Sequence, residues 1–358
     1  MDSKEQIIIL GAGLAGLTTA YYLHKQGIPY RIIEGRDRPG GRIHTIRTES
    51  GSTIEMGATW FAPKHGHLMD LIHELKVPYQ DQYTGTKVLY DYADPHRMVR
   101  VFELPAQSDE QYLFTHGTKS LIDALLSKVG DRSISTGQRV LSMDFQESVV
   151  QVKSGQGTFF GSQLGNTLPP NLLVNTIDIQ PGLPTALREL AQQTHTWMGE
   201  SIKVGLEFEE DYWRPTEIGT LLSQFGPAQE LHDHQHEGAE SRVLKGFIHP
   251  DLHPVGRHKR QEQVEEQMRM YFDALSVSPK YYEKDWQEDD FTFFPYPSAL
   301  VPHQNNGHPY YRQTFMDGRL IFAGSETAQV FPGYLDGAVE RAKQVAASLI
   351  KSFDSSRF

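Results

Sequence analysis

The N-terminal 42 residues contain two short apolar runs separated by one amphipathic stretch. Ile7–Leu10 is continuously apolar, which is typical of a parallel strand buried on both faces. Apolar side chains then recur at helical intervals between Leu14 and Leu23, and Gly27 is a natural helix stop. Tyr30–Ile33 is the second apolar run. The pattern predicts a strand, a helix and a second strand parallel to the first.

The rest of the chain alternates between helical and strand-like periodicity. Amphipathic helices are predicted over residues 66–77, 117–129, 184–193 and 261–275, and a last helix from about 336 to 350. Alternating apolar positions predict a hairpin over 88–104, a strand pair over 139–152 and a half-buried strand within 198–214. Residues 172–179 and 319–323 are expected to be buried strands. A chain of 358 residues is long enough for two compact units.

Three glycines and one acid are placed around the first helix in a meaningful order. Gly11, Gly13 and Gly16 follow the first strand in G-x-G-x-x-G spacing, and Glu34 ends the second strand. Gly11 permits a tight turn, Gly13 lets a pyrophosphate approach the backbone, and Gly16 lets helix and strand pack closely. The helix N-terminus offers free N–H groups to the phosphates, and Glu34 can accept hydrogen bonds from ribose hydroxyls. The segment therefore predicts a Rossmann-like dinucleotide site.

A basic, glycine-containing run follows Glu34 directly. It reads RDRPGGR, from Arg36 to Arg42, and includes Gly40 and Gly41. This run resembles the signature of FAD-dependent amine oxidases and their relatives. The resemblance implies that FAD is the dinucleotide, that the two glycines bring backbone against it, and that Arg42 lies near its flavin end.

A second run that resembles this family lies near the C-terminus. The sequence FAGSETA is followed by FPGYLDGAV, which is similar to the motif of flavin-containing monoamine and polyamine oxidases. The resemblance implies that Glu326 lies near the ribityl chain or pyrophosphate and that the last helix directs its N-terminus at the flavin. It also implies that Tyr334 forms one wall of an aromatic cage. Tyr296, ten residues after Trp286, is expected to be the other wall, with Phe294 as the alternative.

Weaker matches extend the expected site. Further FAD contacts that the resemblance implies are Leu14, Ala15, Gly35, Gly57, Ala58, Thr59, Val140, Gly324, Gly333, Leu335 and Ala338. Val140 presents its backbone to the adenine in this reading, although an ordinary sheet residue is equally compatible with the sequence. The resemblance also places Lys203 where amine oxidases carry a lysine that reaches flavin N5 through a water. The alternative is an ordinary strand lysine that faces solvent. The family's valine-alanine-x-proline-proline run is expected to end the strand at 172–179, where the sequence instead reads NTIDIQPG.

Composition narrows the function classes. The net charge of −11 argues against nucleic acid as a partner. The absence of cysteine excludes disulfides, iron–sulfur clusters and a flavin attached through a cysteine thioether, so FAD is expected to be non-covalent. The sequence has neither a basic leader nor a run of about 18 apolar residues. We therefore expect a soluble, cytoplasmic protein that does not bind a membrane, while its oligomeric state stays open.

The sequence has closely spaced histidines, as a metal site would, at positions 232, 234, 236, 249, 253 and 258. Their surroundings are loop-like and acidic, with no regular element to set ligand geometry. We expect a solvated loop here and no metal.

These observations together predict an α/β fold with a Rossmann-like FAD-binding domain, of mixed or parallel sheet with helices, plus an inserted α+β substrate domain. The FAD-binding domain is expected at 1–63, 114–180 and 291–358, and the substrate domain at 64–113 and 181–290. The segment 64–113, inserted between the first two pieces of the FAD-binding domain, is shorter than the resemblance to the larger amine oxidases would lead one to expect. We therefore expect a reduced substrate domain.

The resemblance implies oxidation of a small amine. A hydride leaves the amine α-carbon for flavin N5, the imine hydrolyses to an aldehyde or ketone, and molecular oxygen is reduced to hydrogen peroxide. Lys203, Tyr334 and Tyr296 are the expected catalytic residues. Two alternatives stay open: an FAD-dependent C–C desaturase or isomerase of the same superfamily, and a non-catalytic FAD-binding module.

Overall fold

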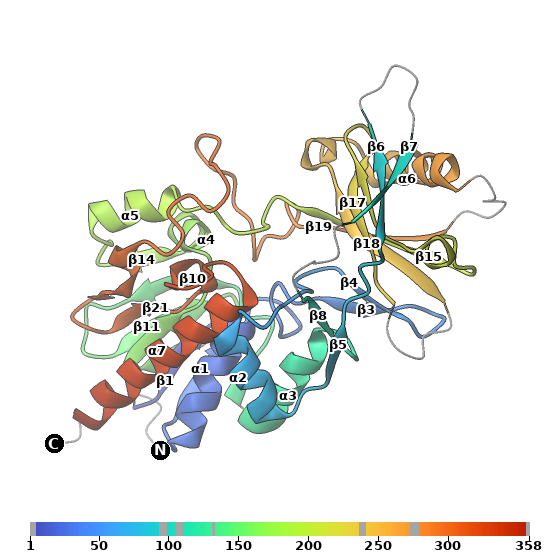
Figure 1. The fold of residues 1–358 in the computed structure, drawn as a ribbon. Coiled ribbons are helices and arrows are strands. Elements are labelled where there is room, and N and C mark those ends of the chain that lie inside the picture. Colours follow the sequence, from blue (N-terminus) through green and yellow to red (C-terminus); the bar gives the residue numbers. More distant parts are fainter. Residues whose placement is uncertain are drawn as a thin grey trace.

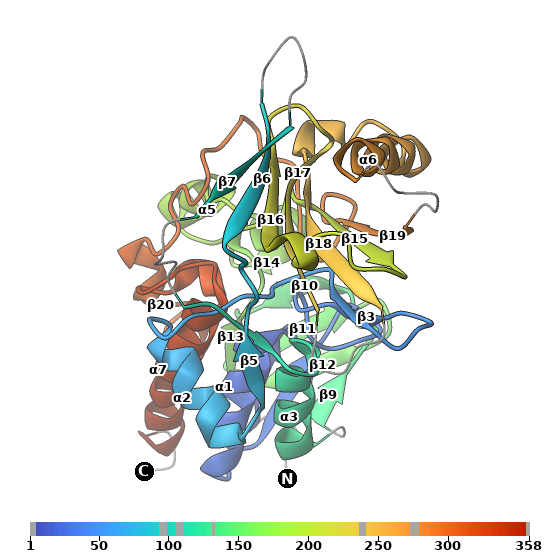
Figure 2. The ribbon, with the colours of Figure 1, turned by 45° about the vertical axis from the view of Figure 1, so that its right-hand side comes forward.

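The computed structural model describes residues 5–92, 99–104, 110–130, 133–235, 241–272 and 279–355. Within these ranges the chain forms two lobes, which Figures 1 and 2 show from two sides. One lobe carries both chain ends and most of the helices, and the other carries a large sheet with α6 beside it.

A six-stranded sheet forms the centre of the first lobe. Its order is β20-β21-β13-β1-β2-β9, and β1 pairs in parallel with both β2 and β13. The strands are β1 (Ile7–Leu10), β2 (Tyr30–Ile33), β9 (Ile134–Ser135), β13 (Gln163–Asn166), β20 (Thr314–Phe315) and β21 (Leu320–Phe322). The predicted parallel pairing of the first two strands is confirmed, and β1 is buried along its whole length.

Helices cover one face of this sheet. They are α1 (Leu14–Lys25), α2 (Gly66–Leu75), α3 (Lys119–Val129) and α7 (Leu335–Ser355). Ile7 and Ile9 of β1 pack into the same core as Leu17 of α1 and Val339 of α7. Because side chains alternate along a strand, Ile8 and Leu10 face the opposite layer. The last helix thus packs on the first, although more than 300 residues separate them.

The opposite layer combines a small sheet with two helices. The sheet order is β12-β11-β10-β14, made of β10 (Val140–Asp144), β11 (Val150–Ser154), β12 (Thr158–Gly161) and β14 (Asp178–Gln180). The helices are α4 (Pro170–Thr176) and α5 (Thr185–Gln192). The predicted strand pair at 139–152 is confirmed as β10 and β11, which pair antiparallel.

The expectation of one buried strand over 172–179 is wrong. Most of this segment is α4, because Pro170 occupies the first turn of a helix, where its missing N–H costs nothing. The strand that pairs with β1 is instead β13, which ends at Asn166. The sequence Thr167-Leu168-Pro169-Pro170 follows it directly. A pair of prolines therefore follows β13 and precedes the segment 172–179.

A seven-stranded sheet dominates the second lobe. Its order is β19-β15-β18-β17-β16-β6-β7, made of β6 (Lys87–Asp91), β7 (Val99–Glu103), β15 (Ile202–Phe208), β16 (Ile218–Ser223), β17 (Ala228–Asp233), β18 (Arg242–Ile248) and β19 (Lys280–Asp285). The predicted hairpin is confirmed as β6 and β7. The strand predicted within 198–214 is β15, which is buried on both faces rather than on one. Helix α6 (Arg257–Tyr271) contributes Val264 and Met268 to this core, and Leu275 of the predicted helix lies outside the described residues.

Smaller elements complete the described chain. They are the hairpin β3 (Thr45–Arg47) with β4 (Thr53–Glu55), the pair β5 (Tyr79–Asp81) with β8 (Tyr112–Phe114), and 3₁₀ turns at Arg214–Thr216, Pro250–Leu252, Pro309–Arg312 and Ser325–Thr327. No helix among the described residues combines the length and apolarity needed to cross a bilayer.

The α/β character is confirmed, while the domain limits stay a prediction. Helices α2 and α5 lie within the ranges expected for the substrate domain, yet their apolar faces join the two cores of the first lobe. Strands from two separate stretches of chain, 87–103 and 202–285, share the seven-stranded sheet.

Candidate functional site

One large pocket lies where the two lobes meet, and it encloses about 1380 Å³ of empty space, part of it open to solvent. Its lining includes most of the residues expected to bind FAD: Gly11, Gly13, Leu14, Ala15, Glu34, Gly35, Arg36, Gly40, Gly41, Arg42, Gly57, Ala58, Thr59, Gly333, Tyr334, Leu335 and Ala338, together with Lys203. Both ends of the chain and a strand of the second lobe therefore contribute to a single cavity.

The glycine turn has the geometry that its spacing predicts. Gly11 has a φ of +101°, a backbone conformation that favours glycine. A Cβ on Gly16 would lie 2.0 Å from the Gly11 carbonyl oxygen, so only glycine lets α1 pack this closely on β1. A Cβ on Gly13 would meet nothing nearer than the Gly41 Cα at 3.9 Å, and it would occupy space between the two glycine loops. Gly13 is thus open toward the pocket, whereas Gly16 is packed behind it.

Glu34 lies beside this turn and is almost fully buried. Its Oε2 accepts a hydrogen bond from the Ala12 N–H at 2.7 Å, and its Oε1 accepts one from the Arg36 N–H at 2.9 Å. Each carboxylate oxygen has a second lone pair. Glu34 is therefore held in place by the backbone and can still accept further hydrogen bonds from the pocket.

Arg42 and Glu326 join the two sequence motifs directly. The guanidinium contacts the carboxylate through two hydrogen bonds, Nη1 to Oε1 at 2.5 Å and Nη2 to Oε2 at 3.0 Å. Arg42 Nη1 also donates to the Trp197 carbonyl oxygen at 2.9 Å. Burial alone would raise the pKa of Glu326, but the charge and hydrogen bonds of Arg42 outweigh it and lower that pKa. Glu326 is fully buried behind Arg42 and does not line the pocket itself.

An aromatic wall stands at the start of α7. Tyr334 lines the pocket and lies beside Trp197, with ring centroids 5.3 Å apart. His303 stacks on Trp197 at 3.8 Å and lies nearly parallel to Tyr334 at 5.6 Å. These spacings leave no room for a ligand between the rings. Trp197 and Tyr334 therefore form one continuous surface.

Tyr296 does not take the place expected for the second cage wall. It is absent from the pocket lining; its hydroxyl accepts a hydrogen bond from the Thr196 N–H at 2.8 Å, and its ring stacks on His195. The alternative, Phe294, is also absent from the lining. Counting residues from Trp286 could not anticipate this, because the backbone of the Thr196 turn captures the tyrosine hydroxyl. The aromatic residue that reaches the pocket beside Tyr334 is Trp197.

Some expected cofactor residues lie just outside the pocket. Gly16 and Gly324 are packed behind it, and Val140 lines a small adjoining cavity that shares Gly35 and Phe291 with the main pocket. Sequence reasoning also missed three aromatic lining residues, Trp197, Phe247 and Phe291, of which Phe247 lies on β18 of the second lobe.

Two buried lysines stand at the second-lobe side of the pocket. Lys203 of β15 lines the cavity, and its Nζ lies 3.7 Å from the centre of the Phe247 ring. Lys245 of β18 is fully buried; its Nζ contacts Thr59 Oγ1 and lies 3.7 Å from the centre of the Trp60 ring. Burial lowers the pKa of Lys203 to about 7. Lys203 was predicted to be a site residue, whereas Lys245 was not.

Replacing Lys203 with methionine is expected to stabilise the FAD-free protein at pH 7 by roughly 2–4 kcal/mol. The lysine pKa is lower in the folded state than in the unfolded chain, so the unfolded chain binds more protons between about pH 7 and the ordinary lysine pKa of 10.5. The cost of burying Lys203 therefore falls as the pH rises through that window, and the gain from methionine should shrink toward pH 10. Urea unfolding at pH 7 and pH 9.5 measures this, with exposed Lys153→Met as the control; an equal gain at both pH values would contradict it.

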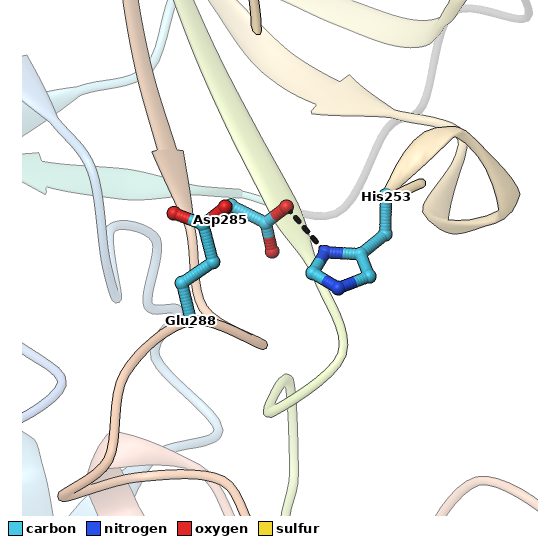
Figure 3. A group of neighbouring side chains, drawn as sticks. All are labelled: His253, Asp285 and Glu288. Atoms are coloured by element: carbon cyan, nitrogen blue, oxygen red, sulfur yellow. Dashed lines mark hydrogen bonds and ion pairs between the residues drawn. The ribbon is translucent and has the colours of Figure 1, made fainter. Parts of the chain in front are cut away.

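The histidines expected to be solvated do not gather around one point. His232 contacts Glu230 and the Trp60 ring, His249 lies beside Asp251, and His236 lies outside the described residues. One group among the described residues, His253 with Asp285 and Glu288, brings its potential ligand atoms within 4.8 Å of one another (Figure 3). The Arg260 guanidinium lies 3.6 Å from Asp285, and His253 Nδ1 lies 2.7 Å from the same carboxylate. These ion pairs account for the cluster, and we assign no metal to it.

The fold defines an α/β protein with one large pocket lined by both of its lobes. Comparison with known proteins makes the class specific: the family model of flavin containing amine oxidoreductases matches residues 14–103 and 89–350. The chain belongs to this family and is an oxidoreductase. Among curated relatives, a probable flavin-containing monoamine oxidase A of Dictyostelium discoideum is 22% identical, with 98% of each chain covered. Amine oxidase B of Bos taurus is 20% identical, covering 98% of this chain and 87% of that protein.

Solved structures share the fold over nearly the whole chain. Cyclohexylamine oxidase from Brevibacterium oxydans IH-35A superposes with a TM-score of 0.86 at 18% identity, covering 98% of this chain and 100% of that one. Wild-type putrescine oxidase bound to putrescine superposes with a TM-score of 0.83 at 19% identity, covering 97% and 99%. The alignment with the Dictyostelium relative spans 457 positions, more than the 358 residues of this chain, so that relative contains segments that are missing here.

Proposed function

We propose that the chain binds FAD non-covalently in the described pocket and oxidises a small amine with molecular oxygen as electron acceptor. The observation that carries this proposal is the convergence of three separate parts of the chain on one cavity. They are the glycine turn after β1, the Gly40–Gly41–Arg42 loop and the start of α7. A site for a smaller nucleotide would not need the third part.

The donors and acceptors around the pocket fit FAD. The first N–H groups of α1 lack partners within the helix, and neither a capping side chain nor an acid in the first turn competes for them. Glu34 is held at the end of β2, where a ribose would lie. Val140 and Phe291 border the small cavity beyond Gly35, which suits an adenine ring. The space above Gly13 is free for a pyrophosphate.

The other end of the pocket suits the reacting ring. Leu335 and Ala338 of the first turn of α7 line it, and a helix N-terminus stabilises negative charge in front of it. Bound FAD would supply the chemistry itself, by accepting a hydride from the amine α-carbon and passing electrons to oxygen to give hydrogen peroxide. The resulting imine would hydrolyse in water to an aldehyde or ketone.

The chain's own residues would orient the amine. Tyr334 and Trp197 present a flat aromatic surface that accommodates an amine and its carbon chain. Arg42 and Glu326 hold the backbone around Trp197, because Arg42 donates to its carbonyl oxygen and Glu326 accepts from its N–H at 3.3 Å. The aromatic surface is therefore tied to the cofactor end of the pocket. Lys203, across the cavity, would hold a water at its Nζ and supply positive charge during oxygen reduction.

The purified protein tests this proposal. It should be yellow, show a flavin absorbance spectrum and release FAD on denaturation. Under anaerobic conditions one or more members of a panel of mono-, di- and polyamines should bleach it, and oxygen should restore the colour with release of peroxide. A yellow protein that no amine bleaches would favour a desaturase, isomerase or non-catalytic flavoprotein. A protein that never takes up FAD would refute the cofactor assignment.

Lys203→Met is expected to slow reoxidation of the reduced flavin by oxygen about tenfold or more, while FAD stays bound. The reason is loss of the only described lysine on the pocket lining, and with it the positive charge and the water site at Nζ. Stopped-flow mixing of amine-reduced protein with oxygen measures the rate. Unchanged oxygen kinetics with normal FAD content would show that Lys203 has no such role.

A further inference from the structure

Lys245 lies directly behind Lys203 and has no part in the site as proposed so far. In the antiparallel pairing of β15 with β18, Lys203 is opposite Phe247 and Lys245 is opposite Gly205. The two lysines are therefore diagonal neighbours on the same face of the sheet. Ile54 and Met56 fill the space beside Gly205, because a Cβ there would lie 2.5 Å from Ile54 Cγ2 and 3.0 Å from Met56 Cε. Lys203 is 5% exposed and Lys245 is 0% exposed, and their Nζ atoms lie 5.5 Å and 3.7 Å from the centre of the same Trp60 ring.

The surroundings limit the charge that this lysine pair can carry. Glu230 of β17 and Glu55 of β4 are the carboxylates that act on it, and His232 contacts Glu230. Glu55 is itself buried, and burial raises its pKa, which favours its neutral form. Burial and mutual repulsion both disfavour two adjacent ammonium groups, so the pair gives up one proton near neutral pH.

Geometry distinguishes the two amines. Lys203 lines the pocket and is 5% exposed, so its amine can meet water or substrate. Lys245 Nζ contacts Thr59 Oγ1 and is enclosed by the Trp60 ring, with no exposed surface. A neutral Lys245 amine can donate to Thr59 and still offer its nitrogen lone pair to Lys203. An ammonium at Lys245 has no lone pair to offer.

We propose that Lys245 is a positioning residue: its neutral amine accepts a hydrogen bond from Lys203 and keeps the single proton of the pair on the nitrogen that faces the pocket. This inference rests on the proposed function and adds a residue to it. The proton on Lys203 Nζ is then available when oxygen is reduced. The directions of the pKa shifts agree: burial and the charge of Lys203 lower the pKa of Lys245 well below its usual range, whereas burial lowers the pKa of Lys203 only to about 7, because its interaction with Lys245 opposes that shift.

NMR titration of the FAD-loaded protein, labelled with ¹³C and ¹⁵N at lysine, tests the proposal without requiring turnover. Lys203→Met and Lys245→Gln identify the two signals. In the wild-type protein, the last proton of the pair should leave Lys203 Nζ near pH 7. Lys245→Met removes the acceptor and should lower the apparent pKa of Lys203 by about one unit or more. Lys245→Gln keeps an acceptor oxygen and should stay within about half a unit of the wild type.

The outcomes separate this proposal from the proposed function. If no amine bleaches the flavin but the titration behaves as expected, the amine oxidase assignment fails and the lysine arrangement stands. If Lys245→Met leaves the pKa of Lys203 unchanged or raises it, the arrangement is wrong. If Lys245→Met fails to fold, the titration of the wild-type protein tests the proposal by itself. The proposal is wrong if the last proton of the pair leaves Lys245 rather than Lys203. In an active enzyme, the pH profile of flavin reoxidation should move with the titration.

Discussion

Replacing Arg42 with methionine is expected to destabilise the protein by about 3 to 5 kcal/mol at pH 7 and to prevent FAD retention. Arg42 makes both hydrogen bonds to Glu326, whose side chain is fully buried, and a third to the Trp197 carbonyl. Without the guanidinium, Glu326 is a buried carboxylate that has lost its charged partner and keeps hydrogen bonds from neutral groups, among them the Ser325 hydroxyl and the Trp197 N–H. Urea unfolding and flavin absorbance after desalting measure the two effects.

The double variant Arg42→Met with Glu326→Gln is the matched control. It removes the unpaired charge as well as its partner, so it should recover a large part of the lost stability. The pH dependence gives a second check. The lowered pKa of Glu326 means that its ion pair contributes fully above its unfolded value of 4.5 and is lost as the pH falls through the lower folded value. In Arg42→Met the destabilisation should instead be largest near neutrality and shrink on acidification, because protonation discharges Glu326.

Alanine at Gly13 and at Gly16 is expected to have opposite consequences, although the two positions are three residues apart. Gly16→Ala places a Cβ 2.0 Å from the Gly11 carbonyl oxygen, so α1 must move off β1 and the protein should lose more than about 4 kcal/mol or fail to fold. Gly13 has an ordinary φ of −75°, and a Cβ there meets no atom closer than 3.9 Å. Gly13→Ala should fold normally but bind FAD about 100-fold more weakly, because the methyl group occupies the pyrophosphate position.

Unfolding of the FAD-free proteins and FAD titration separate these two results. Equal stability loss in both variants would mean that Gly13 is a packing residue like Gly16. Normal FAD affinity in a well-folded Gly13→Ala protein would show that the FAD phosphates do not bind at this turn.

The sequence predicted the first lobe best where residue type and spacing both had a physical reason. Ile7–Leu10, the glycine turn and Glu34 needed no tertiary information, because turn, helix and acid follow one another within a single supersecondary unit. The central strand β13 was missed because its sequence, QLGN, is half polar. Its burial comes from β1 and β21 on either side, which no local pattern reveals. The apolar run at 172–174 was taken for a strand, although Pro169-Pro170 marks a helix start.

The second lobe shows where the sequence is less informative. Lys203 could be placed by its alternating strand and by resemblance, whereas Lys245 sits in RVLKGFI, where a single lysine looks like an ordinary solvated side chain. Its side chain is buried against Thr59 and Trp60, which lie far from it in the sequence. The predicted position of Tyr296 in the aromatic cage was wrong for a similar reason. The backbone N–H of Thr196, 100 residues away, determines where the tyrosine hydroxyl points. Contacts between distant segments decided these positions.

The pairing of the central sheet also bears on how the protein is made. Ile7 pairs with Gln163, and Leu164 pairs with Leu320. A ribosome therefore synthesises β1 long before its neighbour β13. A similar length of chain must then be made before β21, the other neighbour of β13, is available. Throughout vectorial synthesis the nascent chain exposes open strand edges that can pair with other chains. We expect newly made protein to depend on chaperones until almost the whole message has been translated.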